Sequence, residues 1–223
     1  MCLSLVYCAL SSNGFIDYAQ ESPLYQTLIE MVKNVSCEEL LKLLVAIFYK
    51  LIKVNFEVVE DLVPRFIDLI GSSFEKVSFG ATLIIKKILK DEPDWVQQEK
   101  HHYLADNLMK KISDSSFERK RMYLKCLLRL LRIVSRNFLK ELTNKKLVGM
   151  LMEFLDFGYD ADLTDTILDL LKSLVNMEFE ECGTLNLMDE IMENGGEDTL
   201  KQFLDCEDEE AAELATKLLN LAQ

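Results

Sequence analysis

The chain has 223 residues, of which 49% are hydrophobic, and its formal net charge is −13. So large an apolar fraction excludes intrinsic disorder, which requires too little hydrophobicity to form a core. The 8 Gly and 3 Pro are too few for an all-β sandwich or barrel, whose many turns are rich in both residues. Neither GxGxxG nor GxxxxGK[ST] occurs, so the usual nucleotide-binding loops are excluded and a helical chain remains.

The charge is unevenly distributed along the chain. Residues 156–223 hold 19 acidic and 3 basic side chains, a net charge of −16, whereas residues 1–155 hold 19 acidic and 22 basic side chains, a net charge of +3. Within the first part, residues 110–146 hold 12 basic and 3 acidic side chains. An acidic chain disfavours non-specific binding to nucleic acid, whose affinity comes from phosphate neutralisation. The basic block at residues 110–146 leaves nucleic-acid binding by that part of the chain as an alternative.

The 6 cysteines and 2 histidines do not form a metal-binding pattern, because no cysteine pair has CxxC spacing and the histidines are neighbours. We therefore expect no metal and no cofactor, and we interpret the cysteines as buried free thiols in a reducing compartment. The longest apolar run, at residues 1–10, is too short to span a bilayer and has no basic segment before it. The sequence predicts a cytoplasmic and/or nuclear protein without membrane association.

Polar turns recur along the chain at residues 36, 73, 116, 160 and 207. A Ser or Asp at each turn is expected to cap a helix, and the acids that follow suit the positive end of the helix dipole. Apolar residues at i, i+3 and i+4 between the turns predict amphipathic helices. In chain order the predicted helices are 3–11 and 24–35, 38–54 and 56–70, 75–90 and 95–112, 118–136 and 139–157, 162–177 and 185–204, and 209–221.

A repeat of roughly 40–47 residues with two or three helices is the signature of armadillo and HEAT proteins. The sequence therefore predicts an all-α fold, a right-handed α-solenoid of armadillo/HEAT-like repeats, formed as one domain over residues 1–223. Its units are 1–35 (partial), 36–72, 73–114, 115–158 and 159–223. A non-repetitive helical bundle is the alternative.

The last third of the chain resembles a known family. Its segments are the apolar helix 147–155, Thr166-Ile-Leu-Asp-Leu-Leu-Lys-Ser-Leu174, Met188-Asp-Glu-Ile-Met-Glu-Asn-Gly-Gly-Glu-Asp-Thr-Leu200 and the acidic turn 207–210. Their order is similar to that of the final armadillo repeats of importin-α (karyopherin-α). The resemblance implies a non-enzymatic nuclear-transport adaptor that binds transport receptors at an acidic C-terminal surface, here Asp189, Glu190, Glu193, Glu207, Asp208, Glu209 and Glu210.

Importin-α binds basic peptides along a concave groove of Trp and Asn side chains, and this chain departs from that pattern. The Trp positions correspond to Cys8, Ala46, Leu83, Leu128 and Asp169, and the Asn positions to Ser12, Lys50, Lys87, Arg132 and Ser173. Three cations in the Asn positions would repel a basic peptide. We therefore expect a groove that favours an acidic peptide or the chain's own acidic tail, lined by Lys50, Lys87, Leu83, Leu128, Arg132, Asp169 and Ser173.

Three other functions are weighed against the adaptor. The first is a scaffold or regulatory subunit of a protein complex, since stacked repeats build extended binding surfaces. The second, less favoured, is nucleic-acid binding by a basic stripe on the predicted helix 118–136, formed by Arg121, Lys125, Arg129 and Arg136. An enzyme is not expected, because no catalytic motif or paired metal ligand is visible. The partner and the oligomeric state stay open.

Overall fold

The computed structural model describes residues 23–53, 57–96, 98–143, 147–156 and 161–222, and all the regular structure within these ranges is helical. The expected helix at 3–11 lies outside the described residues. The described chain divides into two compact units, unit 1 up to Ile133 and unit 2 from Val134 onward. The single domain and the repeat boundaries expected from the sequence stay predictions.

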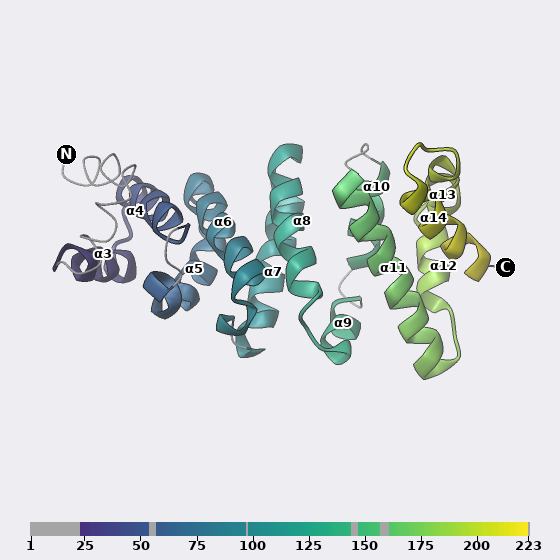
Figure 1. Cartoon of the computed structure of the whole chain (residues 1–223), viewed down its shortest axis with the longest axis horizontal. Helices are drawn as coiled ribbons and strands as arrows, with labels where there is room; N and C mark the ends of the chain where they lie inside the picture. Colours follow the sequence, from purple (N-terminus) through teal and green to yellow (C-terminus); the bar gives the residue numbers. More distant parts are fainter. Residues whose placement is uncertain (1–22, 54–56, 97, 144–146, 157–160, 223) are drawn as a thin grey trace. The chain divides into compact units, whose positions relative to one another are not determined.

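The described part of unit 1 starts with two α-helices and continues with two sets that each consist of a short 3-10 helix and two α-helices (Figure 1). Its elements are α3 (Pro23–Asn34), α4 (Glu38–Leu51), η1 (Glu57–Leu62), α5 (Val63–Ile70), α6 (Glu75–Asp91), η2 (Pro93–Trp95), α7 (Gln98–Asp114) and α8 (Phe117–Leu131). Unit 2 contains two sets of three α-helices among its described residues. They are α9 (Arg136–Thr143), α10 (Leu147–Asp156), α11 (Ala161–Cys182), α12 (Asn186–Glu193), α13 (Gly196–Leu204) and α14 (Glu209–Leu221).

The order of elements repeats as a short first helix, a second helix and a long third helix. In unit 1 the first helix is a 3-10 helix, whereas in unit 2 it is a full α-helix. The long helices α4, α6, α8, α11 and α14 begin at residues 38, 75, 117, 161 and 209. Each start lies within two residues of the start that the polar turns predict.

Several predicted helices were too long, because breaks in the chain divide them. The predicted helix 56–70 is interrupted before Pro64, which occupies the first turn of α5, where its missing N–H costs nothing. The predicted helix 185–204 is divided by Gly195, whose φ of +79° is a left-handed conformation that favours glycine. The predicted helices 95–112 and 139–157 likewise start later or divide, whereas 162–177 extends to Cys182.

The predicted capping by Ser and Asp is only partly right. At α14 the Asp208 carboxylate accepts hydrogen bonds from the backbone N–H groups of Glu210 (3.1 Å) and Ala211 (3.2 Å). At α4 and α6 the capping positions are held by Cys37 and Phe74, which make no side-chain cap. The acids that follow still lie in the first turn of each helix, where the helix dipole favours them.

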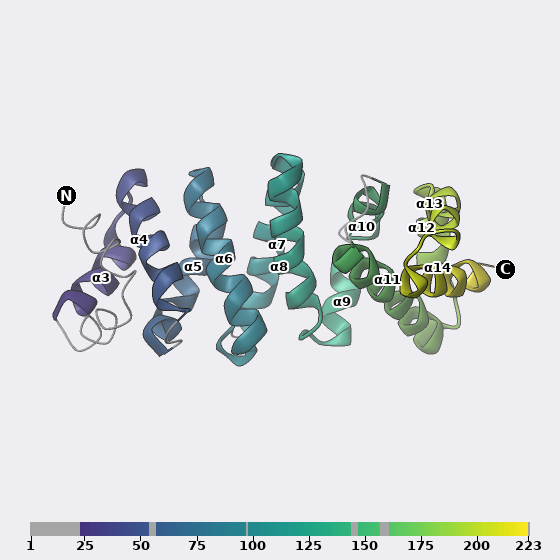
Figure 2. The ribbon, with the colours of Figure 1, turned by 45° about the horizontal axis from the view of Figure 1, so that its top comes forward.

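The long helices of unit 1 form one layer, in which α6 packs between α4 and α8 (Figure 2). A second layer is formed by α5 and α7, which pack on α6 and α8 respectively and on each other. A close approach joins α4 to α6, because an ideal Cβ on Gly80 would lie 2.5 Å from Cγ1 of Val45. Phe48 and Phe66 meet edge to face, with their ring centroids 5.8 Å apart.

A buried hydrogen-bond chain ties three helices of unit 1 together. The Ser78 hydroxyl of α6 donates to the carbonyl of Ile70, at the end of α5, over 2.6 Å. Since this bond uses the only hydroxyl proton of Ser78, the Tyr123 hydroxyl of α8 donates to Ser78 Oγ over 3.1 Å. Both side chains are fully buried, so each polar atom needs its partner.

In unit 2, α14 packs on α11 and α13, and α10 contacts α11, α12 and α13. The turn between α12 and α13 is tight, since an ideal Cβ on Gly196 would lie 2.5 Å from the carbonyl oxygen of Ile191. Glu178 of α11 holds the start of α12, where its carboxylate accepts from the backbone N–H of Leu187 (2.8 Å) and from the Asn186 side chain (3.0 Å).

Candidate functional site

The exposed face of the long helices of unit 1 is strongly basic. Because α4, α6 and α8 start 37 and then 42 residues apart, equivalent positions on their outer face can be matched. Ala46, Leu83 and Lys125 are one such set, and Lys50, Lys87 and Arg129 are the set one turn later; all are at least partly exposed. We define the basic face by the following partly or fully exposed cations on or directly after these helices: Lys42, Lys50, Lys53, Lys76, Lys86, Lys87, Lys90, Arg121, Lys125, Arg129 and Arg132.

Apolar side chains lie among these cations. Leu43, Phe79, Leu83 and Met122 are half-buried at positions of the same helix faces. The acids of these helices are near their ends, and one of them, Asp91, pairs with Lys87 over 2.7 Å. The face therefore combines positive charge with apolar surface.

Three cations converge where α6 meets α8. The guanidinium Nη1 of Arg129 donates to the backbone carbonyl of Lys86 over 2.8 Å, and Lys86 Nζ donates to Met122 Sδ over 3.2 Å. Burial lowers the pKa of Lys86, and the nearby charges of Arg129 and Lys125 lower it further. A thioether is a weak, neutral acceptor, so Met122 does not neutralise Lys86, whereas the Asp91 carboxylate lies near enough to Arg129 for the two charges to interact.

The groove residues predicted from the sequence fall in different environments. Lys50, Lys87 and Leu83 lie on the basic face, whereas Leu128 is only 4% exposed. In α8 the exposed positions equivalent to Leu83 and Lys87 are Lys125 and Arg129, so the sequence register there was displaced by three residues. Arg132 follows the helix as its C-cap and is exposed.

The other two predicted groove residues, Asp169 and Ser173, are exposed on α11 of unit 2. Along their own helix they occupy the positions that Leu83 and Lys87 occupy along α6. The equivalent positions are thus Ala46, Leu83 and Lys125, and Lys50, Lys87 and Arg129, in unit 1, but an acid and a hydroxyl on α11 of unit 2.

The basic stripe was predicted to lie on one long helix, residues 118–136, and that helix was predicted too long. Helix α8 ends at Leu131 and α9 begins at Arg136. The Ser135 hydroxyl accepts a hydrogen bond from the backbone N–H of Phe138 over 3.3 Å, which caps a new helix. Arg121, Lys125 and Arg129 share the exposed face of α8, while Arg136 lies in unit 2, where it pairs with Glu180.

Five cations of the basic face were missed by sequence reasoning: Lys42, Lys53, Lys76, Lys86 and Lys90. The signal was present in the sequence. The same spacing between long helices that matches Lys50 to Lys87 also matches Lys53 to Lys90, and both are exposed. To find such cations, the repeat period has to be applied to every position of the long helices, and not only to the two that correspond to the Trp and Asn positions.

The acids of the predicted C-terminal partner surface belong to two elements of unit 2. Asp189, Glu190 and Glu193 lie on α12, and the others, Glu207, Asp208, Glu209 and Glu210, lie at the start of α14. Asp208 has a structural role there as a helix cap. Burial raises the pKa of Glu190, and the carboxylates of Glu193 and Glu178 raise it further.

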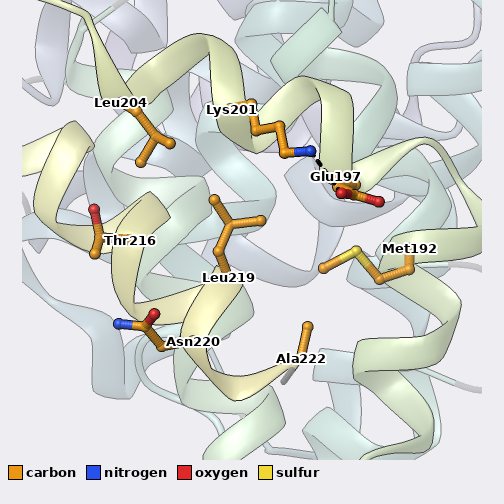
Figure 3. Close-up of a pocket in the computed structure, with 8 residues that line it drawn as sticks. All are labelled: Met192, Glu197, Lys201, Leu204, Thr216, Leu219, Asn220 and Ala222. Carbon is orange, nitrogen blue, oxygen red and sulfur yellow. Dashed lines mark hydrogen bonds and ion pairs between the residues drawn. The ribbon is translucent and has the colours of Figure 1, made fainter.

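Unit 2 also holds a cavity of about 460 Å³ beside α12, α13 and α14. Its lining combines the apolar side chains of Met192, Leu204 and Leu219 with the ion pair between Glu197 and Lys201, whose atoms are 2.6 Å apart (Figure 3). Within the described ranges, no group of three or more His, Cys, Asp or Glu side chains could hold a metal ion. No described helix is both long and apolar enough to cross a membrane.

Comparisons with known proteins identify the fold. No model of a protein family matches the chain, and no curated protein matches its sequence. Solved structures do match. A computationally designed armadillo repeat protein for modular peptide recognition is 17% identical, with a TM-score of 0.70 over 98% of this chain and 90% of that one. A designed armadillo repeat protein in complex with peptide (KR)4 is 16% identical, with a TM-score of 0.64 over 99% of this chain and 91% of that one.

These neighbours, together with a third designed armadillo repeat protein at 16% identity and a TM-score of 0.67 over 99% of this chain and 92% of that one, confirm the predicted fold class. The chain has an all-α fold of armadillo-type repeats. Identities this low show the fold alone, so the site must be argued from the residues of this chain.

Proposed function

We propose that the chain is a non-enzymatic protein-binding armadillo repeat protein whose basic face holds an extended acidic peptide. The proposal is carried by one observation: cations occupy equivalent, partly exposed positions on three consecutive long helices, at Lys50, Lys87 and Arg129. A row of like charges with this spacing attracts a chain of opposite charge and repels a basic one.

The fold neighbours support a peptide as the partner, and the charge of the face determines its chemistry. One neighbour was designed for modular peptide recognition, and another was solved with the basic peptide (KR)4. The present chain has cations on the exposed face of its long helices, so we expect the opposite charge preference. Half-buried Leu43, Phe79 and Leu83 on this face favour a peptide with apolar side chains over a nucleic-acid backbone, which would use the cations alone.

The proposal is tested by fluorescence anisotropy with a labelled acidic peptide, the basic peptide (KR)4 and a single-stranded oligonucleotide. The test variant carries Lys50→Glu, Lys87→Glu and Lys125→Glu. Reversal of three charges on the face should weaken binding of the acidic peptide at least about tenfold. The basic peptide should bind the wild-type protein more weakly than the acidic one.

A matched control carries Lys33→Glu, Lys100→Glu and Lys110→Glu. These residues lie on α3 and α7, outside the basic face, and the net charge changes by the same amount. The control should retain most of its affinity, since only the local charge is expected to matter. Equal losses in both variants, or preferential binding of (KR)4 or the oligonucleotide, would contradict the proposal.

The finer form of the proposal is an importin-α-like adaptor that acts in the cytoplasm and/or the nucleus and contacts nuclear-transport receptors through acids of unit 2. It is supported by the order of the segments from residue 147 onward and by Gly195 and Gly196, which form the turn before α13. A scaffold without transport partners is the alternative. Affinity purification should recover transport receptors with the wild-type chain and lose them with Glu207→Gln, Glu209→Gln and Glu210→Gln; a stable complex without such receptors favours the scaffold.

A further inference from the structure

The cavity of about 460 Å³ in unit 2 lies between the faces of two packed helices. On α13, Glu197, Lys201 and Leu204 line it from positions i, i+4 and i+7, so they share one face of that helix. On α14, Thr216 and Leu219 line it from positions i and i+3, which likewise share a face. We call the space between these two faces the α13–α14 groove.

The centre of the groove is apolar. Leu219 lies between Leu204 and Met192, and these three side chains line the same cavity (Figure 3). Leu204 is 41% exposed, and Met192 and Leu219 are partly exposed. Single exposed apolar residues are common on protein surfaces. Three that converge on a cavity of this volume form the concave, largely apolar kind of surface at which proteins bind ligands.

The shape of the groove fits a helix. Side chains on helix surfaces form ridges, and the ridges of one helix pack into the grooves that neighbouring helices present. The lining face of α13 runs from Glu197 to Leu204, which is about 10 Å, or two turns, along the helix. A helix laid along this face presents apolar side chains at i, i+4 and i+7, the usual anchors of a helix that binds in an apolar groove.

The charge around the groove favours a basic partner. Residues 186–222, which include α12, α13 and α14, hold 11 acidic and 2 basic side chains. The two cations, Lys201 and Lys217, each pair with a glutamate of their own helix. A third cation, Lys172 of α11, lies near enough to Glu213 for the two charges to interact. Acids still outnumber these three cations, so this region attracts a basic partner and repels an acidic one.

We propose that the α13–α14 groove binds a basic amphipathic helix of a partner protein. The apolar side chains of that helix fill the cavity against Met192, Leu204 and Leu219, and its lysines or arginines face the acids of residues 186–222. The ion pair between Lys201 and Glu197 stays at the rim, where the aliphatic stem of Lys201 extends the apolar surface. The groove lies in unit 2 and prefers the opposite charge to the basic face of unit 1, so this inference does not rest on the binding of an acidic peptide.

The test uses three labelled helical peptides of about four turns. The lysine peptide has leucines at i, i+4 and i+7 and lysines on its other faces. The glutamate peptide has glutamates in place of the lysines, and the scrambled peptide has the composition of the lysine peptide with its leucines spread around the helix. Fluorescence anisotropy should show that the wild-type protein binds the lysine peptide at least about tenfold more tightly than either of the others.

Two variants locate the site. Leu204→Lys removes an apolar wall of the groove and adds a charge of the same sign as the peptide, so it should weaken binding of the lysine peptide at least about tenfold. Phe179→Lys is the matched control. Phe179 is 56% exposed on α11 and does not line the cavity, so the same kind of change should alter the affinity by less than about twofold. Circular dichroism melting curves confirm that both variants are folded.

Failure of the lysine peptide to bind, equal affinity for the lysine and scrambled peptides, or equal losses in the two variants overturns the inference. Self-association of the wild-type chain that Leu204→Lys abolishes in analytical ultracentrifugation assigns the groove to a second copy and overturns it too. So does binding of the apolar dye ANS at this groove without binding of the lysine peptide, which assigns the groove to a small apolar ligand. Binding of the acidic peptide to the basic face should be the same in Leu204→Lys as in the wild-type protein, so the proposed function stands or fails separately.

Discussion

Each unit crowds charges of one sign together: cations around Lys86 in unit 1 and carboxylates around Glu190 in unit 2. In unit 1, Lys86 has Arg129 and Lys125 as its charged neighbours, and burial together with these cations lowers its pKa. In unit 2, Glu190 has Glu193 and Glu178 as neighbours, and burial together with these carboxylates raises its pKa. Each shift favours the neutral form of the group, which means that the charged form is held at a cost. A net charge of −13 therefore describes neither unit.

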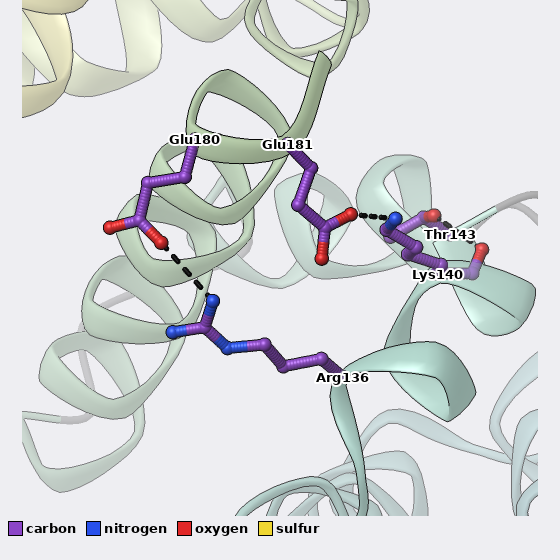
Figure 4. A network of polar contacts seen from close by, with 5 residues as sticks. All are labelled: Arg136, Lys140, Thr143, Glu180 and Glu181. Atoms are coloured by element: carbon purple, nitrogen blue, oxygen red, sulfur yellow. Dashed lines mark hydrogen bonds and ion pairs between the residues drawn. The ribbon is translucent and has the colours of Figure 1, made fainter. Parts of the chain in front are cut away.

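The units also differ in what their cations bind. In unit 1, Arg65 donates to the carbonyls of Val32 (3.1 Å) and Val35 (3.2 Å), and Lys111 donates to the carbonyl of Ser72 (2.6 Å). In unit 2, cations bind carboxylates: Arg136 pairs with Glu180 and Lys140 with Glu181, joining α9 to α11 (Figure 4). Carbonyls at helix ends accept hydrogen bonds without cancelling the charge.

Unit 1 thus uses two of its cations, Arg65 and Lys111, to hold helix ends through neutral carbonyls. Others in unit 1 pair with carboxylates, as Lys42, Lys87 and Arg119 do. Exposed ion pairs such as that of Arg136 contribute little stability, about 0–1 kcal/mol each. Surface ion pairs therefore account for little of the stability of either unit, so the largest effects on stability are expected at buried contacts.

The largest effect is expected at the glycine of unit 2. Gly196→Ala would place a Cβ 2.5 Å from the backbone oxygen of Ile191, and a backbone group cannot move aside without disrupting the end of α12. We expect a loss of about 3 kcal/mol in the free energy of unfolding, measured by urea denaturation with circular dichroism. Gly80→Ala is the matched change in unit 1, where the obstacle is the side chain of Val45.

In α6, alanine has a better helix propensity than glycine by about 1 kcal/mol, which offsets part of the steric cost. The net loss for Gly80→Ala should therefore be about 1 kcal/mol, and Val45→Ala should relieve the clash in the double variant. A loss at Gly80 as large as that at Gly196 would show that side-chain and backbone obstacles are equivalent here.

A smaller effect is expected from the buried hydrogen-bond chain, for which unit 1 offers a graded pair of variants. Ser78→Ala removes the donor to Ile70 and the acceptor for Tyr123, leaving two buried polar groups without a partner, at a cost of about 2–3 kcal/mol. Tyr123→Phe removes only one bond, because Ser78 still donates to Ile70, and should cost about 1 kcal/mol. The reverse order in urea denaturation would show that Tyr123 has another role in the core.

Much of the fold was predictable because it depends on local patterns. The polar turns before α6, α8 and α14 locate the long helices, and the apolar period between them identifies amphipathic helices. Boundaries were less predictable. A single left-handed residue, Gly195, divides one predicted helix, and the cap by Ser135 divides another; both require φ/ψ information that an apolar period does not contain.

The candidate site was predictable in kind but not in register. The sequence indicated a cationic row at Lys50 and Lys87, but it placed the third member at Arg132 rather than Arg129. A three-residue shift turns a position by about 60° around the helix, which is enough to exchange the partly exposed Lys125 for the buried Leu128. The convergence of Lys86 with Arg129 depends on how α6 packs against α8, which is a tertiary contact.

The smallest predicted effect concerns the crowded carboxylates of unit 2. The pKa of Glu190 is raised above its ordinary value of 4.5, so the folded state favours the protonated, neutral side chain. The stability contributed by this shift is present below pH 4.5 and is lost as the pH rises through the raised value. Glu190→Gln, which is always neutral, should therefore raise Tm by about 1 °C at pH 7, because the group is half-exposed and its interactions are screened.

At pH 4 the difference between Glu190→Gln and the wild-type protein should disappear, since the wild-type side chain is then protonated as well. Glu209→Gln is the matched control: Glu209 lies in the first turn of α14, where the helix dipole favours a negative charge. Its neutralisation should lower Tm slightly at pH 7. If both variants changed Tm in the same direction, net charge rather than local crowding would govern the stability of unit 2, and the contrast with Lys86 would lose its physical basis.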